Sequence, residues 1–285
     1  MTVNSHYRDI EVKKVSSRVV IAQYKDYYQL NAAAIIMNNQ IVVIDTLYYP
    51  SQGLFFRKLV EEEFGLPVKF LFLTHYHCDH VFGMSSFNDT TVIGSNDLFV
   101  NIKQRLKTRW TKEYFENWMK SEPPIADEIR KISIRCPDIA FEGEYILNDE
   151  DLILKFFHSG GHTSCSAFAY FPDERVLFTG DEIIAHAWPF IFDTTLNPDR
   201  YIDSLKSMLK LDVEFVVAGH GPVVGLNHVK EYLEHLMNLK RCIISGISEG
   251  KSPDSIDVPK FYTPHTDWQI SEAKRIMYSY YSNHH

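Results

Sequence analysis

The chain has 285 residues, of which 29 are basic and 37 acidic, so its formal net charge is −8 at pH 7. Hydrophobic residues make up 45% of the sequence and charged residues 23%, a balance that allows a buried core and excludes a wholly disordered chain. No basic stripe is present to bind a phosphate backbone, so we expect no nucleic-acid partner. The 13 histidines are the unusual feature of the composition.

Neither export nor a membrane segment is indicated. Residues 1–14 are polar and lack the apolar segment of a secretory signal. The longest clearly apolar run, residues 32–37, is far shorter than the ~18 to 20 residues of a membrane-spanning helix. The cysteines are widely separated and form no CxxC motif, which favours free thiols; they are Cys78, Cys136, Cys165 and Cys242. We expect a cytoplasmic protein without a membrane partner.

The first third of the chain combines short strands with one helix. Runs rich in β-branched and aromatic residues predict strands at 19–24, 33–37, 41–44, 69–73 and 92–94. Asn38 and Asn39 favour a hairpin turn between the second and third of these strands. Apolar residues at helical spacing predict a helix over 51–64, which Gly65 and Pro67 end.

A helical insertion is predicted at about 96–137, because the strand pattern disappears there and aromatic residues recur at helical spacing. The strand pattern then returns, and a helical tail closes the chain at about 250–285. The predicted strands lie at 144–147, 152–158, 167–171, 176–178 and 213–217, and the predicted helices at 201–211, 229–247 and 267–280.

This order of elements predicts an α+β fold. Two rounds of strands followed by helices favour two mixed β-sheets packed face to face with helices outside, a four-layer αββα sandwich. No linker rich in Pro, Gly or Ser divides the sequence, so we expect residues 1–285 to form a single domain.

The densest group of chemically active side chains follows the strand predicted at 69–73. His75, His77, Asp79 and His80 fall within six residues. Imidazole and carboxylate are the usual ligands of Zn²⁺ and related divalent ions. Because side chains in an extended segment alternate, His75 and His77 can face one point, and the two later residues can face a neighbouring point. One loop can therefore serve two ions.

Three further loops carry a ligand-type residue next to glycine, which lets the backbone approach a site closely. They are Gly161-His162-Thr163, Gly180-Asp181-Glu182 and Gly219-His220-Gly221, each predicted at the end of a strand. Isolated histidines are usually ordinary core or surface residues, but this combination of four loops predicts a metal site.

These motifs resemble those of the metallo-β-lactamase superfamily, in its binuclear metal-dependent hydrolase branch, which includes glyoxalase II-like and lactonase-like members. The matching segments are Ile44-Asp45, HxHxDH at 75–80, GHT at 161–163, TGD at 179–181 and GHGP at 219–222. The resemblance implies an αββα sandwich with the site at one edge between the sheets. It also implies that His75, His77 and His162 hold one metal ion, that Asp79, His80 and His220 hold the other, that Asp181 bridges them, and that Asp45 orients the ligand loop by hydrogen bonding.

The activity implied is hydrolysis by a hydroxide shared between two divalent metal ions. Zn²⁺ is the expected metal, with iron or manganese as alternatives. The expected substrate is a small molecule with an ester, lactone, thioester or related bond, and Asp79 is expected to handle the proton of the attacking water. Class B lactamases of the family mostly carry Cys or Ser at the position of Asp181, so lactamase activity is not favoured. The alternatives are an iron-dependent persulfide dioxygenase-like oxidoreductase and a phosphodiesterase or nuclease.

Substrate contacts are expected from aromatic segments around the metals. His186, Trp188 and Phe190 follow Asp181 closely and are predicted to line a pocket. The aromatic residues of the insertion, Trp110, Tyr114 and Trp118, fit the same role. Both groups equally fit core packing or a homodimer contact, so these alternatives stay open.

Overall fold

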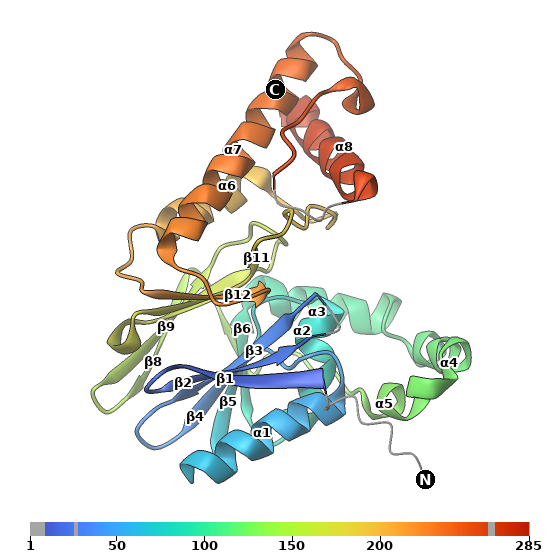
Figure 1. Ribbon diagram of the computed structural model, residues 1–285. Coiled ribbons are helices and arrows are strands. Elements are labelled where there is room, and N and C mark those ends of the chain that lie inside the picture. Colours follow the sequence, from blue (N-terminus) through green and yellow to red (C-terminus); the bar gives the residue numbers. More distant parts are fainter. Residues whose placement is uncertain (1–8, 26–27, 262–265, 285) are drawn as a thin grey trace.

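The strands form two facing sheets that meet at one edge, with helices on both outer faces (Figure 1). This computed structural model describes residues 9–25, 28–261 and 266–284. The first sheet contains β1 (Ile10–Ser16), β2 (Val19–Tyr24), β3 (Leu30–Ile36), β4 (Ile41–Ile44), β5 (Val68–Phe72), β6 (Thr91–Ser95) and β7 (Ile139–Phe141). The second contains β8 (Glu144–Asp149), β9 (Leu152–His158), β10 (Ala167–Phe171), β11 (Val176–Ile184) and β12 (Phe215–His220).

Hydrogen bonds connect these strands in the order β7-β6-β5-β4-β3-β12-β11-β10-β9-β8, with β2 also paired to β3 and β1 paired to β2. The pairs β4–β5, β5–β6, β6–β7 and β11–β12 are parallel, and the others are antiparallel. Within the described residues, β3 and β12 meet only where Leu30 lies opposite His220. The two predicted sheets are therefore joined at a corner, and the predicted αββα class is confirmed.

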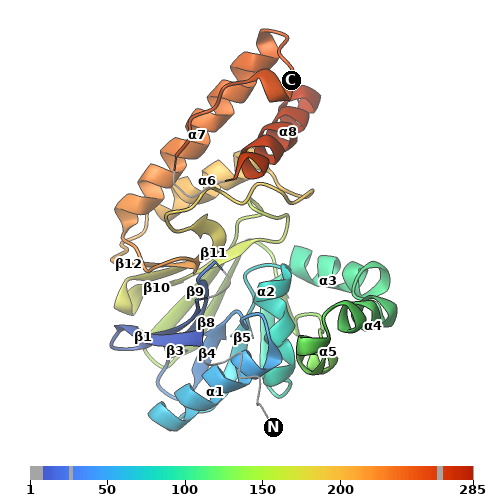
Figure 2. The same cartoon turned by 45° about the vertical axis from the view of Figure 1, so that its right-hand side comes forward.

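Eight α-helices occur in the described ranges. α1 (Pro50–Phe64), α2 (Cys78–Val81), α3 (Asn96–Thr108), α4 (Lys112–Ser121) and α5 (Ala126–Lys131) accompany the first sheet, and α6 (Pro198–Met208), α7 (Leu226–Ser248) and α8 (Asp267–His284) the second. Figure 2 shows α7 and α8 side by side at one end of the molecule and α3 to α5 projecting beside α2. None of the described helices has the length and apolar character needed to cross a bilayer.

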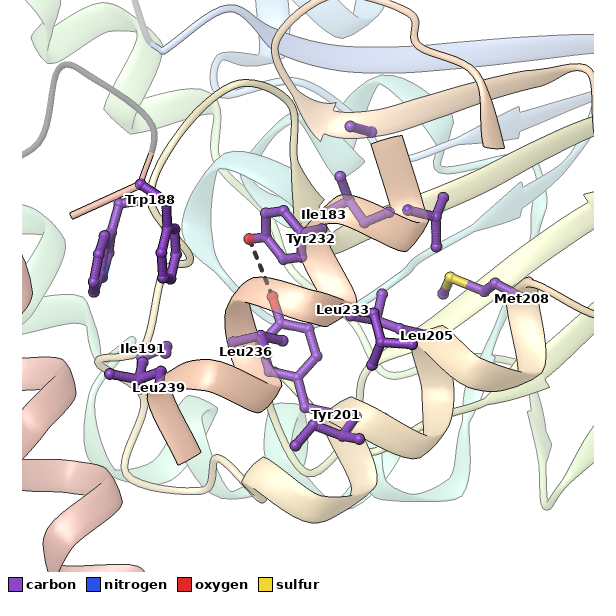
Figure 3. Close-up of a cluster of buried hydrophobic side chains, with 14 of the residues drawn as sticks. Ile183, Trp188, Ile191, Tyr201, Leu205, Met208, Tyr232, Leu233, Leu236 and Leu239 are labelled. Carbon is purple, nitrogen blue, oxygen red and sulfur yellow. Dashed lines mark hydrogen bonds between the residues drawn. The ribbon is translucent and has the colours of Figure 1, made fainter. Parts of the chain in front are cut away.

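Three buried clusters hold the layers together. Ile35 and Val42 of the first sheet and Phe156 and Phe178 of the second belong to the cluster between the sheets. A second cluster lies under α1 to α3 and a third under α6 to α8. In the third cluster the hydroxyl oxygens of Tyr201 and Tyr232 lie 3.4 Å apart (Figure 3). Each large apolar side chain removed from water contributes about 1.5–3 kcal/mol, so these clusters fix the sheets that carry the site.

Most of the predicted elements are present, some with the predicted bounds and others shifted or extended by a few residues. The predicted strand at 176–178 runs on to Ile184 past a register shift between Phe178 and Gly180, and the strand predicted at 213–217 runs to His220. His220 therefore lies at a strand end as predicted, whereas the prediction that Asp181 lies at a strand end is wrong, because β11 continues past it. The shift in pairing with β12 accompanies a bend that lets β11 continue beside the site. Of the helical insertion predicted at about 96–137, the part up to Lys131 contains α3, α4 and α5, and residues 132–137 are not helical. A single domain over 1–285 stays a prediction.

The helix α3 matters for the site because it ends beside it. The side chain of Ser95 accepts a hydrogen bond from the backbone N–H of Leu98 and caps the helix start, and Asp97 adds a negative charge in the first turn. The helix closes at Arg109, whose N–H donates to the carbonyl of Arg105. Both arginines thus lie at the C-terminal end of α3.

Candidate metal centre

The loop after β5 delivers four of the predicted ligands by changing its conformation partway. His75 and His77 lie in the segment before α2, and His77 has an extended backbone as the N-cap of that helix. Asp79 and His80 then lie within the single turn of α2. The change from extended chain to helix turns the two pairs toward neighbouring points.

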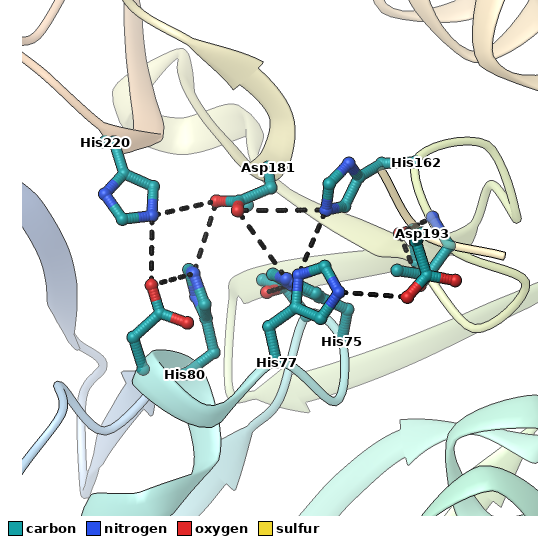
Figure 4. A network of polar contacts seen from close by, with 12 residues as sticks. His75, His77, His80, His162, Asp181, Asp193 and His220 are labelled. Atoms are coloured by element: carbon teal, nitrogen blue, oxygen red, sulfur yellow. Dashed lines mark hydrogen bonds and ion pairs between the residues drawn. The ribbon is translucent and has the colours of Figure 1, made fainter. Parts of the chain in front are cut away.

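The first group of potential ligands contains His75, His77, His162 and Asp181, whose ligand atoms all lie within 4.8 Å of one another. Nδ1 of His77 lies 3.2 Å from Nε2 of His162. Nε2 of His75 and Nε2 of His162 lie 3.7 and 3.8 Å from Oδ2 of Asp181 (Figure 4). Two imidazoles thus approach one carboxylate oxygen of Asp181, and the third, that of His77, contacts His162.

A second group, formed by Asp79, His80 and His220, has the same 4.8 Å limit. Oδ2 of Asp79 lies 3.2 Å from Nε2 of His220. The other oxygen of Asp181, Oδ1, lies 3.2 Å from Nε2 of His80 and 3.5 Å from Nε2 of His220. The two carboxylate oxygens of Asp181 therefore face different groups, which is the geometry that a bridging ligand requires.

Polar contacts behind the imidazoles fix their orientation. Nδ1 of His80 lies 2.8 Å from Oδ2 of Asp45, and Nδ1 of His75 lies 3.0 Å from the hydroxyl of Thr74. Nε2 of His77 lies 3.1 Å from Oδ2 of Asp193. A contact at one ring nitrogen fixes the orientation of the imidazole and leaves the other nitrogen available as a metal ligand. Asp45 thus occupies the position expected from the sequence, whereas Asp193 was missed.

These residues fit divalent cations. Nε2 of His75 and Nε2 of His80 are buried and make no hydrogen bond with any residue in the described part of the chain. Burial, followed by repulsion from neighbouring imidazoles, holds the pKa of His75 well below its usual value and lowers that of His162 to about 4. A neutral imidazole is the form that binds metal. Imidazole nitrogen and carboxylate oxygen suit Zn²⁺ and its neighbours.

Asp181 is ionised in this setting. Burial acts to raise the pKa of its carboxyl group, but the imidazoles of His80 and His220 outweigh burial and hold the pKa well below its usual value. A buried carboxylate is stabilised by positive charge nearby, so the ionised Asp181 favours bound cations at this point.

Glu182 and Gly219 are two neighbours of Asp181 that shape the site; the sequence predicted a close backbone approach at the glycine but no role for Glu182. Oε1 of Glu182 accepts hydrogen bonds from the hydroxyl of Ser159, at 2.8 Å, and from the backbone N–H of His162, at 3.2 Å. Glu182 therefore holds the loop that carries His162. At Gly219 an added Cβ would lie 2.0 Å from Oδ1 of Asp181, so only glycine leaves room for the carboxylate.

A cavity of about 230 Å³ opens beside the two groups. Trp188 and Phe190 line it, together with Ile184, Ala187 and Gln269 of α8, and their contact with substrate stays a prediction. His186 is not among the lining residues that the structure describes, and its ring instead lies 4.7 Å from that of His228. Its positive φ of 57° accompanies this departure of the side chain from the cavity. The structure thus places the ring of His186 beside His228, and a role for it in the pocket stays a prediction.

None of the three aromatic residues predicted from the insertion is among the described residues that line this cavity: Trp110 is buried in the core, and Tyr114 and Trp118 are partly buried and pack against it. The rings of Trp110 and Trp118 lie 5.7 and 5.8 Å from that of Phe82, and Tyr114 lies 6.2 Å from Trp118. Of the two alternatives that the sequence left open, these contacts favour core packing.

The cysteines are free thiols. Cys78 lines the cavity between two ligand positions, but burial, and after it the charge of Asp79, raises the pKa of its thiol to about 12. Cys165 is buried, and burial raises the pKa of its thiol to about 12 as well. These shifts keep both thiols protonated near neutral pH, so neither is an activated nucleophile.

Fold and site together define an αββα protein with two adjoining groups of histidine and aspartate at the edge where its sheets meet. The model of the metallo-beta-lactamase superfamily matches residues 28–220, which include every residue of both groups. The chain belongs to this superfamily, whose members are mostly hydrolytic metalloenzymes.

Relatives in sequence are distant. The chain is 24% identical over 210 residues to Beta-lactamase-like protein 2 homolog of Caenorhabditis elegans, covering 72% of this chain and 61% of that protein. It is 24% identical over 192 residues to Lactamase-like protein nscB of Arthroderma otae, covering 65% of this chain and 44% of that protein. The chain thus spans about half of the lengths of these curated relatives.

Solved structures share the fold. A metallo-beta-lactamase from Pontibacter korlensis superposes with a TM-score of 0.62 at 20% identity, covering 80% of this chain and 99% of the other. The structure of VMB-1 gives a TM-score of 0.62 at 16% identity, with 80% and 97% covered.

Proposed function

We propose that the protein is a metal-dependent hydrolase that uses two divalent cations to cleave an ester, lactone, thioester or related bond of a small molecule. Zinc is the metal that we propose, ahead of iron and manganese. One observation carries this proposal: ligand-type atoms converge in two groups on the two oxygens of Asp181. His75, His77 and His162 would hold one ion, and Asp79, His80 and His220 the other, with Asp181 shared.

Divalent ions bound at these positions would lower the pKa of a water molecule toward neutrality and polarise the substrate carbonyl. The protein's own residues would do the remaining work. Asp79, 3.2 Å from His220 at the cavity wall, would ligate and accept the proton of the attacking water. Asp45 and Asp193 would keep His80 and His77 in the ligating orientation.

The cavity favours an apolar group beside the reacting bond. Its polar lining comes mainly from the two ligand groups, and the remaining wall contains Ile184, Ala187, Trp188 and Phe190. Such walls exclude water and bind apolar parts of a ligand, while the few polar groups orient the bond to be cleaved.

The proposal is tested by metal quantification on protein purified without added metal, beside a hydrolysis screen over lactones, thioesters, carboxylic esters, β-lactams, phosphodiesters and sulfate esters. We expect close to two ions per chain and turnover of an ester, lactone or thioester. No turnover with two ions bound would overturn the hydrolase proposal. One iron per chain with oxygen uptake would instead support the oxidoreductase alternative, and turnover limited to phosphodiesters the nuclease alternative.

A further inference from the structure

A second cavity, of about 220 Å³, adjoins the first. Both cavities are lined by His77, Cys78 and Phe190, so the second opens on the same ligand loop. Its remaining lining differs in character, because Arg105 and Arg109 enter from the end of α3. The metal centre thus has an apolar cavity on one side and a basic one on the other.

Arg105 is held in place by aromatic rings. Its guanidinium carbon lies 3.7 Å from the centroid of the Tyr76 ring and 5.8 Å from that of Trp110. A guanidinium stacked on an aromatic face keeps its N–H edge available and loses little further freedom when it binds an anion. Arg109, four residues later, lies on the same side of the helix.

No acidic residue in the described part of the chain forms an ion pair with Arg105 or Arg109. Asp193 also lines the second cavity, but its carboxylate is already engaged. Oδ1 accepts hydrogen bonds from the N–H and hydroxyl of Thr195, at 2.8 and 2.6 Å, and Oδ2 contacts the hydroxyl of Tyr76 and the ring of His77. The two guanidinium groups therefore remain available to a ligand.

The location of Arg105 and Arg109 next to the ligand loop favours the binding of an anion. The carboxylate of Asp193 supplies one negative charge in this cavity, so the two guanidinium groups leave a net positive charge beside a centre that would hold cations, and a further anion would relieve that repulsion. The dipole of α3 explains a basic residue in its last turn, as at the exposed Lys107, but it does not explain guanidinium groups lining a cavity next to His77.

We propose that Arg105 and Arg109 bind a terminal oxyanion, a carboxylate or a phosphate, of the substrate, so that the enzyme prefers molecules with an apolar part and an anionic end. This inference rests on the proposed hydrolase function. The apolar part would occupy the cavity lined by Trp188 and Ile184, and the anionic end would pass Phe190 to reach the arginines.

The test compares Arg105→Gln and Arg109→Gln with a matched control, Lys107→Gln, which removes the same charge from an exposed position on the same helix. The substrates are three 4-nitrophenyl esters with acyl chains of equal length that end in a methyl, a carboxylate or a phosphate group. In the unchanged protein we expect a higher kcat/KM for one of the anionic esters. Each arginine substitution should lower that value by about 10-fold and leave the neutral ester unaffected.

The carboxylate and phosphate esters distinguish the two sources of the anion. If the ratio of anionic to neutral kcat/KM is the same in the unchanged protein and both arginine variants, the inference is overturned. The same holds if Lys107→Gln lowers the ratio equally, because overall surface charge would then account for the preference.

A binding measurement separates failure of this inference from failure of the proposed function. Ether analogues of the three esters, which cannot be hydrolysed, are titrated into metal-loaded protein by calorimetry. Tighter binding of an anionic ether that weakens about 10-fold in the arginine variants supports the inference even when no ester is turned over. Equal Kd values in all four proteins would show that the anion binds elsewhere, including at the metals, and would overturn it.

Discussion

Oδ2 of Asp45 lies 2.8 Å from Nδ1 of His80, and both side chains are buried. The carboxylate therefore keeps the proton on Nδ1 and presents Nε2 to the second group of ligands. Asp45 also accepts hydrogen bonds from the backbone N–H and the hydroxyl of Thr74, at 2.9 and 2.8 Å, which ties the start of the ligand loop to β4.

Asp45→Asn should weaken metal binding selectively at the second group. An amide can still accept the Thr74 N–H bond, but it no longer holds His80 with a charge. We expect the affinity for one of two Zn²⁺ ions to fall about 10–100-fold in a calorimetric titration. Asp149→Asn, at a buried carboxylate that accepts a hydrogen bond from the backbone N–H of Asn39 and belongs to neither ligand group, is the control and should leave both affinities unchanged. Equal affinities in Asp45→Asn and the unchanged protein would contradict the assigned role.

Asp193→Asn should affect the other group, because Asp193 contacts His77. We expect the affinity for the first ion to fall about 10–100-fold while the second is retained, the reverse of the Asp45 variant. Each variant thus serves as the control of the other. Loss of the same ion in both variants would show that the two carboxylates do not act on separate groups.

An element of the fold can be predicted from the sequence when its own residues carry the pattern, and cannot when it depends on contacts with residues distant in the sequence. Buried strands such as β5 are continuous apolar runs, so their positions could be predicted locally. β1 was not predicted because its lysines interrupt the apolar pattern and it is only half-buried. β7 was not predicted because it has only three residues. Long-range pairing with β2 and β6 forms these two strands.

The site divides in the same way. HxHxDH could be found because its four ligand-type residues are adjacent in sequence, and the glycines beside His162, Asp181 and His220 marked the other loops. Asp193 contacts His77 across 116 residues and carries no local motif, so only the folded structure reveals it. Arg105 and Arg109 likewise carry no local motif, and only the folded structure shows that the end of α3 brings them next to the ligand loop.

Asp79→Asn tests the proposed proton transfer. An asparagine at this position preserves shape but cannot accept the proton of the attacking water, so we expect kcat to fall about 100-fold or more at saturating metal. Metal content has to be measured on the same samples, because Asp79 belongs to the second ligand group. Unchanged kcat with two ions bound would remove the proton-accepting role while leaving the ligand role intact.

Gly219→Ala should disrupt the centre through Asp181. The added Cβ would lie 2.0 Å from Oδ1, so the bridging carboxylate has to move. We expect fewer than two ions per chain and a lower Tm, with secondary structure retained by circular dichroism. The matched control is Gly225→Ala, where the nearest atom would be the carbonyl oxygen of Glu214, 3.9 Å from the new Cβ. Two tightly bound ions in Gly219→Ala would contradict the close-approach argument.

The pair formed by His186 and His228 predicts a pH dependence of stability outside the metal centre. Nε2 of His228 accepts a hydrogen bond from the backbone N–H of His186, at 3.3 Å. Burial, and after it repulsion from His186, lowers the pKa of His228 to about 4, although Glu231, 3.9 Å away, opposes the shift. His228 is therefore protonated near pH 6.5 in the unfolded chain but only near pH 4 in the folded protein. Because the unfolded chain binds the extra proton in this range, the contribution of His228 to the free energy of unfolding falls as pH decreases from 6.5 to about 4.

His228→Gln keeps a hydrogen-bond acceptor but does not titrate. In urea denaturation at pH 7.5, 6.5, 5.5 and 4.5, we expect the stability of the unchanged protein to fall more steeply with acid than that of the variant, by a slope of at most one proton. Loss of metal at low pH affects both proteins and cancels in the difference. Parallel curves would show that His228 has the same pKa in the folded and unfolded chain, and that its burial beside His186 does not exclude the proton.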